Sequence, residues 1–196
     1  MSISTTATLR GAYLRRSTAL TQTALVIGGV GFLAVLAQIA IPVPGSPVPV
    51  TGQTLGALLL GTAYGASLGF TTFATYLIVG ILGAPVFASG AHGLAKLTGA
   101  TGGYLVGMLL ASALTGYLAG RKWDQRISTA IPAILLGDAI IFTFGLIWLH
   151  HAAHATWAWT FSKGLAPFVL GEVIKIAIAS TALPTLWRFV PHQQES

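Results

Sequence analysis

Residues 54 to 83 read TLGALLLGTAYGASLGFTTFATYLIVGILG, a run of thirty residues without a charge. A helix crosses the hydrocarbon core with about 20 apolar residues, so this run is long for one span and short for two. It can form one long tilted helix or two short helices that meet near Tyr64 and Gly65. The choice sets the number of spans at five or six, and with it the side of the membrane on which each loop lies.

Four further segments have the length and hydropathy of membrane spans: Thr21–Ile41, Gly103–Ala119, Ile131–His150 and Ala166–Trp187. Each is closed by a charge, a proline or a polar cluster. Of the 196 residues, 54% are hydrophobic and only 7% are charged, against roughly a quarter in soluble domains. The mean hydropathy of +0.79 leaves no polar stretch long enough for a separate soluble domain. We therefore predict a single membrane domain.

The basic residues decide between five and six spans, because those in short loops are retained on the cytoplasmic side. With six spans, seven basic residues fall inside and two outside, whereas five spans divide the same residues five to four. The seven are Arg10, Arg15, Arg16, Arg121, Lys122, Arg126 and Arg188, and the two are Lys96 and Lys163. We predict an all-α protein of six transmembrane helices with both termini in the cytoplasm, comprising a cytoplasmic segment 1–20, a bundle 21–187 and a cytoplasmic tail 188–196.

The composition excludes several classes of function. The chain has no cysteine, which rules out disulfide frameworks, thiolate metal sites and cysteine nucleophiles. Its formal charge of +6 is scattered along the chain and not gathered on one face, so we expect no nucleic-acid partner. No Gly-Lys-Ser or Gly-Lys-Thr triplet occurs, so no ATPase motif is visible.

The predicted outer loops carry the unusual sequences. They are the residues 42–49, with four prolines among eight residues, and the stretches 84–100 and 151–164. Closely spaced prolines favour a stiff, extended segment. Residues 42–49 therefore form either a lid over an outward-facing pocket or a rigid connector, and the sequence leaves both interpretations open.

Three charged residues lie within the predicted spans, where each costs a few kcal/mol or more unless it is paired or used. Glu172 and Lys175 are three residues apart, on one face of the last helix and in its outer half. They are either a self-neutralising structural pair or a site for a polar solute, since a carboxylate accepts N–H bonds and an ammonium group holds an oxygen. Asp138 has no partner near it in sequence, and we assign it no role.

Other residues allow two interpretations each. The stretch TGATGGY (98–104) opens the fourth helix, where free N–H groups attract an anion or a carbonyl oxygen, but Gly102 and Gly103 also suit tight helix packing. His150 and His154 are spaced to share a metal ion, yet neither they nor His151 have a carboxylate nearby, and we predict no metal site and no cofactor. The small residues of the first helix either dock a partner protein or pack internally; they are Ala24, Gly28, Gly29, Gly31, Ala34 and Ala37.

Four motifs occur in a fixed order between Val43 and Ala179: PVTGQTLG (49–56), GAPVFA (83–88), TGGYL (101–105), and PF (167–168) followed by GE (171–172) and Lys175. Together they resemble the BioY family, the biotin-specific substrate-binding (S) components of energy-coupling-factor (ECF) importers. The resemblance implies a six-helix S-component fold with the vitamin bound near the outer surface. It also implies coupling to a separate transmembrane subunit driven by cytoplasmic ATPase subunits. The chain departs from the family at Glu172, where the members usually have Asp.

The resemblance implies a biotin site and a location in the cytoplasmic membrane of a bacterium. We expect Glu172 on the ureido N–H groups, Lys175 or Lys96 on a ligand oxygen, and Phe87 and Tyr104 against the ring system. The complete set of expected binding residues is Gln53, Phe87, Lys96, Thr101, Gly102, Gly103, Tyr104, Glu172 and Lys175. The alternatives are an S component for another vitamin or a metal ion, and an intramembrane enzyme that uses Asp138 or the histidines. Self-association of the chain is left open.

Overall fold

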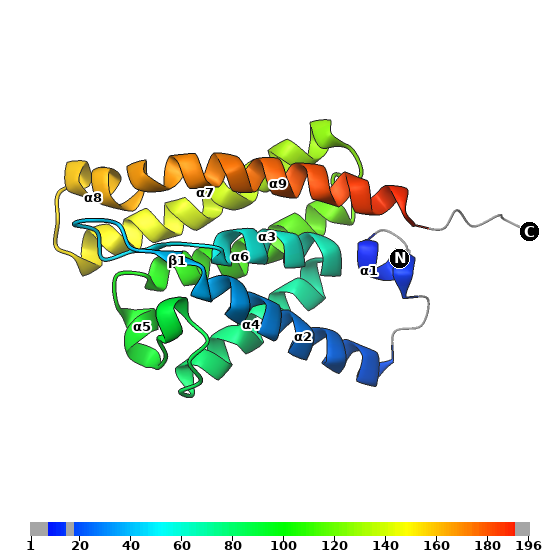
Figure 1. The fold of residues 1–196 in the computed structure, drawn as a ribbon, viewed down its shortest axis with the longest axis horizontal. Helices are drawn as coiled ribbons and strands as arrows, with labels where there is room; N and C mark the ends of the chain where they lie inside the picture. Colours follow the sequence, from blue (N-terminus) through cyan, green and yellow to red (C-terminus); the bar gives the residue numbers. More distant parts are fainter. Residues whose placement is uncertain (1–7, 15–17, 191–196) are drawn as a thin grey trace, which may run out of the picture.

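A computed structural model describes residues 8–14 and 18–190 of the chain. Arg15 and Arg16, half of the predicted N-terminal segment and most of the predicted tail lie outside these residues. Six longer helices form a bundle (Figure 1). They are α2 (Ala19–Gln38), α3 (Gln53–Tyr64), α4 (Ala66–Ile81), α6 (Gly102–Ala119), α7 (Ile127–Ala152) and α9 (Val169–Arg188). The prediction of an all-α membrane protein of about six helices is confirmed.

Gly65 separates the two short helices α3 and α4. Its φ of +85° lies in the left-handed region that glycine adopts without strain, so the chain reverses direction here in a single residue. With 12 and 16 residues, α3 and α4 are about 18 and 24 Å long, shorter than the hydrocarbon core of about 30 Å. Within the described residues, four helical stretches are long and apolar enough to cross a membrane: Ala19–Gln38, Gly102–Ala119, Ile127–Ala152 and Trp157–Arg188.

Smaller elements lie in the loops. The short helix α1 (Leu9–Tyr13) precedes the bundle, and the strands β1 (Ala40–Ile41) and β2 (Val50–Thr51) form an antiparallel hairpin in which Ala40 pairs with Thr51. The remaining elements are η1 (Ala88–Gly90), α5 (Leu94–Thr98), α8 (Trp157–Gly164) and η2 (Ala166–Phe168). Where we predicted an outer loop from residue 151, α7 continues to Ala152, so His150 and His151 lie in a helix.

The central helix α6 packs against α3, α4 and α7 through glycines. A Cβ atom on Gly61 would overlap the Ser112 carbonyl oxygen, and one on Gly69 would lie 2.8 Å from the Gly61 Cα. Within lipid, helices associate by such close backbone approach, because no hydrophobic force drives them together. Helices α3, α4 and α6 therefore lie so close together that a side chain larger than hydrogen at Gly61 would not fit.

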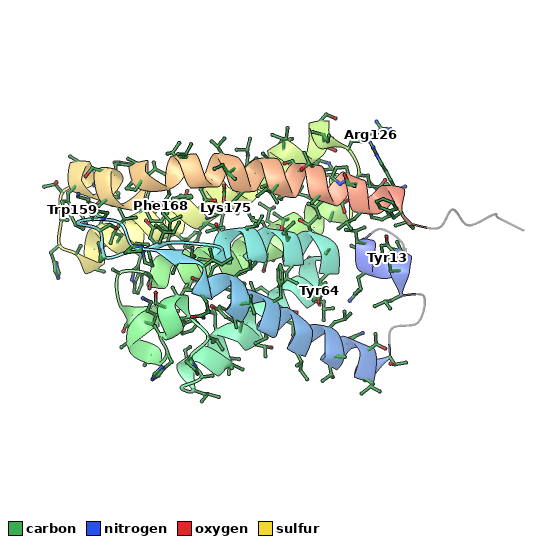
Figure 2. All side chains as sticks on the ribbon, in the orientation of Figure 1. Tyr13, Tyr64, Arg126, Trp159, Phe168 and Lys175 are labelled. Atoms are coloured by element: carbon green, nitrogen blue, oxygen red, sulfur yellow. The ribbon has the colours of Figure 1, made fainter. Side chains whose placement is uncertain are left out.

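The two ends of the bundle differ in their elements and charges. Figure 1 shows α1, the last turns of α9 and the α6–α7 loop at one end, and the hairpin, α5 and α8 at the other. Figure 2 places Arg126 and Tyr13 at the first end and Trp159 at the second. Lys96 and Lys163 belong to α5 and α8. Since basic loops are retained inside, the first end is assigned to the cytoplasm and the second to the outer surface.

Helix α2 is attached to the bundle along one narrow face. Of its twenty residues, only Gly29, Leu33 and Ala37 are buried. A Cβ atom on Gly28 or Gly31 would meet no atom within 4 Å. The small residues of this helix therefore serve two purposes. Gly29 and Ala37 pack against the rest of the bundle, whereas Gly28 and Gly31 leave an open surface on the outward face of α2.

The loop between α6 and α7 is fastened to α9 by a buried acid. The Trp187 Nε1 donates to the Asp124 Oδ2 at 2.6 Å, and Asp124 is 1% exposed. Its Oδ1 has no hydrogen-bond partner among the described residues. Burial raises the pKa of Asp124 to about 6, and the hydrogen bond from Trp187 lowers it in part. The ionised carboxylate is therefore disfavoured in the folded protein.

We expect Asp124 to make the protein less stable as the pH rises. A folded-state pKa of about 6, above the ordinary value of 3.8, means that the folded protein favours the protonated acid. Its stabilising contribution is complete below about pH 4 and is lost as the pH rises through 6, a loss of the order of 2 to 3 kcal/mol. Thermal unfolding of the detergent-solubilised protein at pH 4.5 and pH 8 measures this. Asp124→Asn should show a smaller difference between the two pH values than the parent, and an equal difference would contradict the expectation.

Candidate functional site

A pocket lies at the outer end of the bundle, enclosed by the hairpin, α3, α5, α6, α7 and α9. Its volume is about 30 Å³, well below the roughly 300–1,000 Å³ typical of small-molecule sites, so the pocket is nearly closed. The lining residues are Val48, Pro49, Thr51, Gln53, Thr54, Phe87, Ala88, Lys96, Thr101, Tyr104, Leu105, Met108, Phe142, Phe168, Glu172 and Lys175.

Glu172, Lys175 and Thr54 form a compact polar group on one wall. The Lys175 Nζ donates to the Glu172 Oε1 at 2.7 Å and to the Thr54 Oγ1 at 2.8 Å. The Thr54 Oγ1 lies 3.2 Å from both oxygens of Glu172 and donates to them. Glu172 is 5% exposed and lies in the first turn of α9, where the positive end of the helix dipole favours a carboxylate. Figure 2 shows Lys175 on α9 between the outer and the cytoplasmic ends.

The carboxylate of Glu172 keeps some capacity to accept hydrogen bonds. Its Oε1 accepts from both Lys175 and Thr54, whereas its Oε2 accepts only from Thr54 among the described residues. A carboxylate oxygen has two lone pairs. The Oε2 can therefore accept an N–H donor from a guest molecule without the loss of the existing bonds.

Lys96 gives the pocket a second positive charge. It lies in the last turn of α5 and lines the pocket. Its amino group has no ion-pair or hydrogen-bond partner within residues 8–14 and 18–190, in contrast to that of Lys175. The pocket thus combines a neutralised pair with an unpaired cation, an arrangement that suits a ligand with a polar head and a separate anionic group.

Gln53, the first residue of α3, is held by two hydroxyl groups. The Thr51 Oγ1 donates to the Gln53 Oε1 at 3.2 Å, and the Gln53 Nε2 donates to the Tyr76 hydroxyl at 2.7 Å. Tyr76 in turn donates to the Val86 carbonyl at 2.9 Å. Phe87 packs edge-on against the Tyr76 ring with centroids 5.4 Å apart. These contacts join the hairpin, α3 and α4 at the pocket wall and fix the amide.

Three aromatic rings form another part of the wall. Tyr104 stacks on Phe168 with ring centroids 6.3 Å apart, and Phe142 meets both rings edge-on at 5.9 Å. The Tyr104 hydroxyl donates to the Gly164 carbonyl at 2.8 Å, which anchors it to the end of α8. This cluster offers a rigid apolar surface from three different helical segments.

Of the nine expected binding residues, seven line the pocket. Gly102 and Gly103 do not. A Cβ atom on Gly102 would overlap the Leu97 carbonyl oxygen, and one on Gly103 would overlap the Trp148 side chain. The structure therefore places these two glycines at tight packing contacts, the second of the two interpretations that the sequence allowed. Their neighbour Thr101 lines the pocket and donates to the Lys96 carbonyl at 3.2 Å, which links α5 to the start of α6.

Several lining residues were not among those expected. Thr54 and Phe168 belong to motifs that were recognised, so their position in those motifs was an available signal. Phe142 and Met108 are apolar residues within apolar helices, and nothing in the sequence distinguished them. Asp138 on α7 is 6% exposed and shares a lateral groove between α7 and α9 with Glu172. The Asp138 Oδ1 has no hydrogen-bond partner in the described part of the chain.

The histidines and tryptophans near the outer end pack against one another. His150 stacks on Trp157 with ring centroids 4.0 Å apart. The Trp148 Nε1 donates to the Gly99 carbonyl at 2.9 Å. In the described ranges, no three His, Cys, Asp or Glu residues are grouped closely enough to hold a metal ion.

Comparison with known proteins identifies relatives over nearly the whole chain. The model of the BioY family matches residues 7–192. The chain is 33% identical to biotin transporter BioY2 of Lactococcus lactis, over 90% of this chain and 96% of that protein. It is 31% identical to biotin transporter BioY of Thermotoga maritima, over 80% of this chain and 90% of that protein. The crystal structure of an S-component for biotin from an ECF-type ABC transporter has the same fold, with a TM-score of 0.79, 23% identity and coverage of 88% of this chain and 95% of that one.

Proposed function

The chain belongs to the BioY family, and from this membership we propose that it is the biotin-binding S component of an ECF-type importer in a bacterial cytoplasmic membrane. The observation that carries the proposal is the group of Glu172, Lys175 and Thr54, which lines a pocket at the outer end of the bundle. An ion pair inside a membrane protein is retained where it is used. Here it lies beside a nearly closed cavity that is also lined by aromatic rings.

The ureido ring of biotin complements this polar group. The ring presents two N–H donors and one carbonyl acceptor. The Glu172 Oε2 has free acceptor capacity for an N–H group, and the ammonium group of Lys175, 2.7 Å from the other carboxylate oxygen, can donate to the carbonyl oxygen. Because both protein groups lie on the same side of the pocket, one ureido ring can engage them together.

The remaining parts of biotin find matching surfaces elsewhere in the pocket. The apolar thioether ring suits the cluster of Tyr104, Phe142 and Phe168. The valerate carboxylate suits Lys96, the unpaired cation of the described lining. In this assignment Lys175 serves the ureido oxygen and Lys96 the tail.

The β1–β2 hairpin covers the pocket from the outer side. Val48 and Pro49 line the pocket, and Val48 is buried. The Lys163 Nζ of α8 donates to the Pro44 carbonyl, which ties the proline-rich segment to the rim. These contacts favour the lid over the rigid connector, because a connector needs no side chain in the site. The narrow space means that the lid or the lining must move when the vitamin enters.

The open face of α2 is the surface that we assign to the transmembrane coupling subunit. Gly28 and Gly31 leave room for the backbone of another helix to approach closely. The chain has no ATPase motif, so energy for uptake comes from cytoplasmic ATPase subunits that act through this partner.

Binding of radiolabelled biotin to the purified, detergent-solubilised protein tests the proposal. We expect saturable binding that unlabelled biotin displaces and that other vitamins, Ni²⁺ and Co²⁺ do not. Displacement by another vitamin or by a metal ion, with no response to biotin, would assign the pocket to a different ligand within the same fold.

Lys96→Gln tests the assignment of the two lysines. If Lys96 holds the valerate carboxylate, the substitution should weaken biotin binding by roughly tenfold, as expected for a lost charge-assisted hydrogen bond. Biotin methyl ester has no carboxylate, so the parent and Lys96→Gln should bind it with similar affinity. If the variant loses affinity for acid and ester equally, Lys96 acts in another way. Lys122→Gln is the matched control, since Lys122 is a cation of the α6–α7 loop that does not line the pocket.

A further inference from the structure

A second hollow lies at the cytoplasmic end, far along the bundle from the biotin pocket. It is a groove of about 560 Å³ between the start of α7 and the end of α9. Its polar lining comes from Gln125, Arg126, Ser128 and Arg188, and Pro184 and Trp187 contribute apolar surface. Neither the proposed function nor the motifs of the sequence account for this groove.

The two arginines of the groove carry charges that the described part of the protein does not neutralise. Both side chains are exposed, and neither guanidinium group has an ion-pair or hydrogen-bond partner among residues 8–14 and 18–190. The acidic residue of the same loop, Asp124, is buried and does not line the groove. Its carboxyl group accepts a hydrogen bond from Trp187. Two guanidinium groups thus share one groove to which the described residues contribute no carboxylate.

The start of α7 adds further positive potential. Arg126 is the N-cap residue and makes no side-chain capping bond, and the first turn contains no acidic residue. The backbone N–H groups of Thr129 and Ala130 donate to the Arg126 carbonyl oxygen. Those of Ile127 and Ser128, one turn earlier, have no acceptor in the described part of the chain. Free N–H groups and the helix dipole at such an end favour an anion. Together with the two arginines they make a site for a phosphate group.

A stripe of exposed apolar residues runs from this site along the membrane. Ile127 lines the groove, and Ile131 and Leu135 follow it at intervals of four residues on the same face of α7. All three side chains are exposed. A free phosphate or an acidic protein side chain makes no use of such a stripe, whereas the acyl chains attached to a lipid headgroup would cover it.

From these observations we infer that the groove binds the phosphate of an anionic phospholipid of the inner leaflet, with Arg126, Arg188 and the start of α7 on the headgroup and the acyl chains along the stripe. Basic pockets between helices on the cytoplasmic side suit such headgroups. The site is separate from the biotin pocket, so it adds a specific lipid to the partners of this chain.

Native mass spectrometry of the full chain with added phosphatidylglycerol tests the inference. We expect the parent to retain phosphatidylglycerol in preference to phosphatidylcholine, and the double variant Arg126→Gln/Arg188→Gln to retain roughly tenfold less. Arg121→Gln/Lys122→Gln is the matched control: it removes the same charge from the same end at residues outside the groove, and should retain the lipid as the parent does. Biotin binding by all variants reports that the fold is intact.

Three results would overturn the inference. Equal retention of the two lipids by the parent would show that the headgroup charge is not recognised. Equal losses in the groove variant and the control variant would show a general effect of charge. Displacement of phosphatidylglycerol by millimolar inorganic phosphate would assign the groove to a free anion in place of a lipid.

Discussion

Glu172→Gln should weaken biotin binding by roughly 30-fold to 1,000-fold, the equivalent of about 2 to 4 kcal/mol. The substitution places an amide NH₂ group where the ureido N–H donors require an acceptor. It also removes the carboxylate that Lys175 contacts at 2.7 Å, which leaves an unpaired ammonium group in the pocket. Isothermal titration calorimetry with the solubilised protein measures the loss. Binding by the Gln variant as tight as that of the parent would exclude this role for Glu172.

Two further variants separate binding from stability. Glu172→Asp keeps the negative charge and should bind biotin within about tenfold of the parent, because only the reach of the carboxylate changes. Glu172→Gln/Lys175→Met removes both charges and should unfold at a temperature closer to that of the parent than Glu172→Gln does. If this double variant also recovers biotin binding, the pair is structural and the ligand is held by other groups.

Gly61→Leu should prevent the protein from reaching its native packing. A side chain at Gly61 would overlap the Ser112 carbonyl oxygen and lie within 2.6 Å of the Thr115 Oγ1, so α3 could stay in place only if α6 moved. Overpacking of this kind costs about 3 kcal/mol or more when backbone atoms oppose it. We expect little monodisperse protein on size-exclusion chromatography and a strongly lowered unfolding temperature for what remains.

Gly28→Leu is the control for this prediction. Gly28 is also a helical glycine, but a Cβ atom there would meet nothing within 4 Å. The variant should unfold at the temperature of the parent and bind biotin as the parent does. Equal behaviour of Gly61→Leu and Gly28→Leu would mean that the spacing of α3 and α6 is not set by Gly61.

Much of the fold follows from the sequence because charge is rare in this chain. The distribution of basic residues selected two helices for the run from 54 to 83, and the structure has α3 and α4 separated by Gly65. The helices α5 and α8 were not predicted, because segments of five and eight residues are too short to show a helical pattern of apolar residues within a loop. The two-residue strands of the hairpin also gave no alternation of polar and apolar residues.

The rarity of charged residues also made part of the site predictable. Glu172 and Lys175 are conspicuous because charged residues in an apolar helix need an explanation, and the resemblance added Gln53 and Tyr104. Phe142 could not be found, since an aromatic residue of an apolar helix faces lipid, core or ligand with the same sequence pattern. Gly103 shows the opposite difficulty: whether a glycine serves a ligand or a neighbouring helix depends on what lies opposite, and here that is Trp148.

The proline-rich hairpin has a consequence for how tightly a guest can be held. A flexible cover loses conformational entropy when it closes, at about 1 to 2 kcal/mol for each backbone residue that becomes fixed. Residues 42–49 include four prolines, whose φ angles are already fixed by their rings, so less freedom remains to be lost. More of the contact energy between cover and vitamin then appears as affinity. A preorganised cover of this kind favours slow release of the bound vitamin.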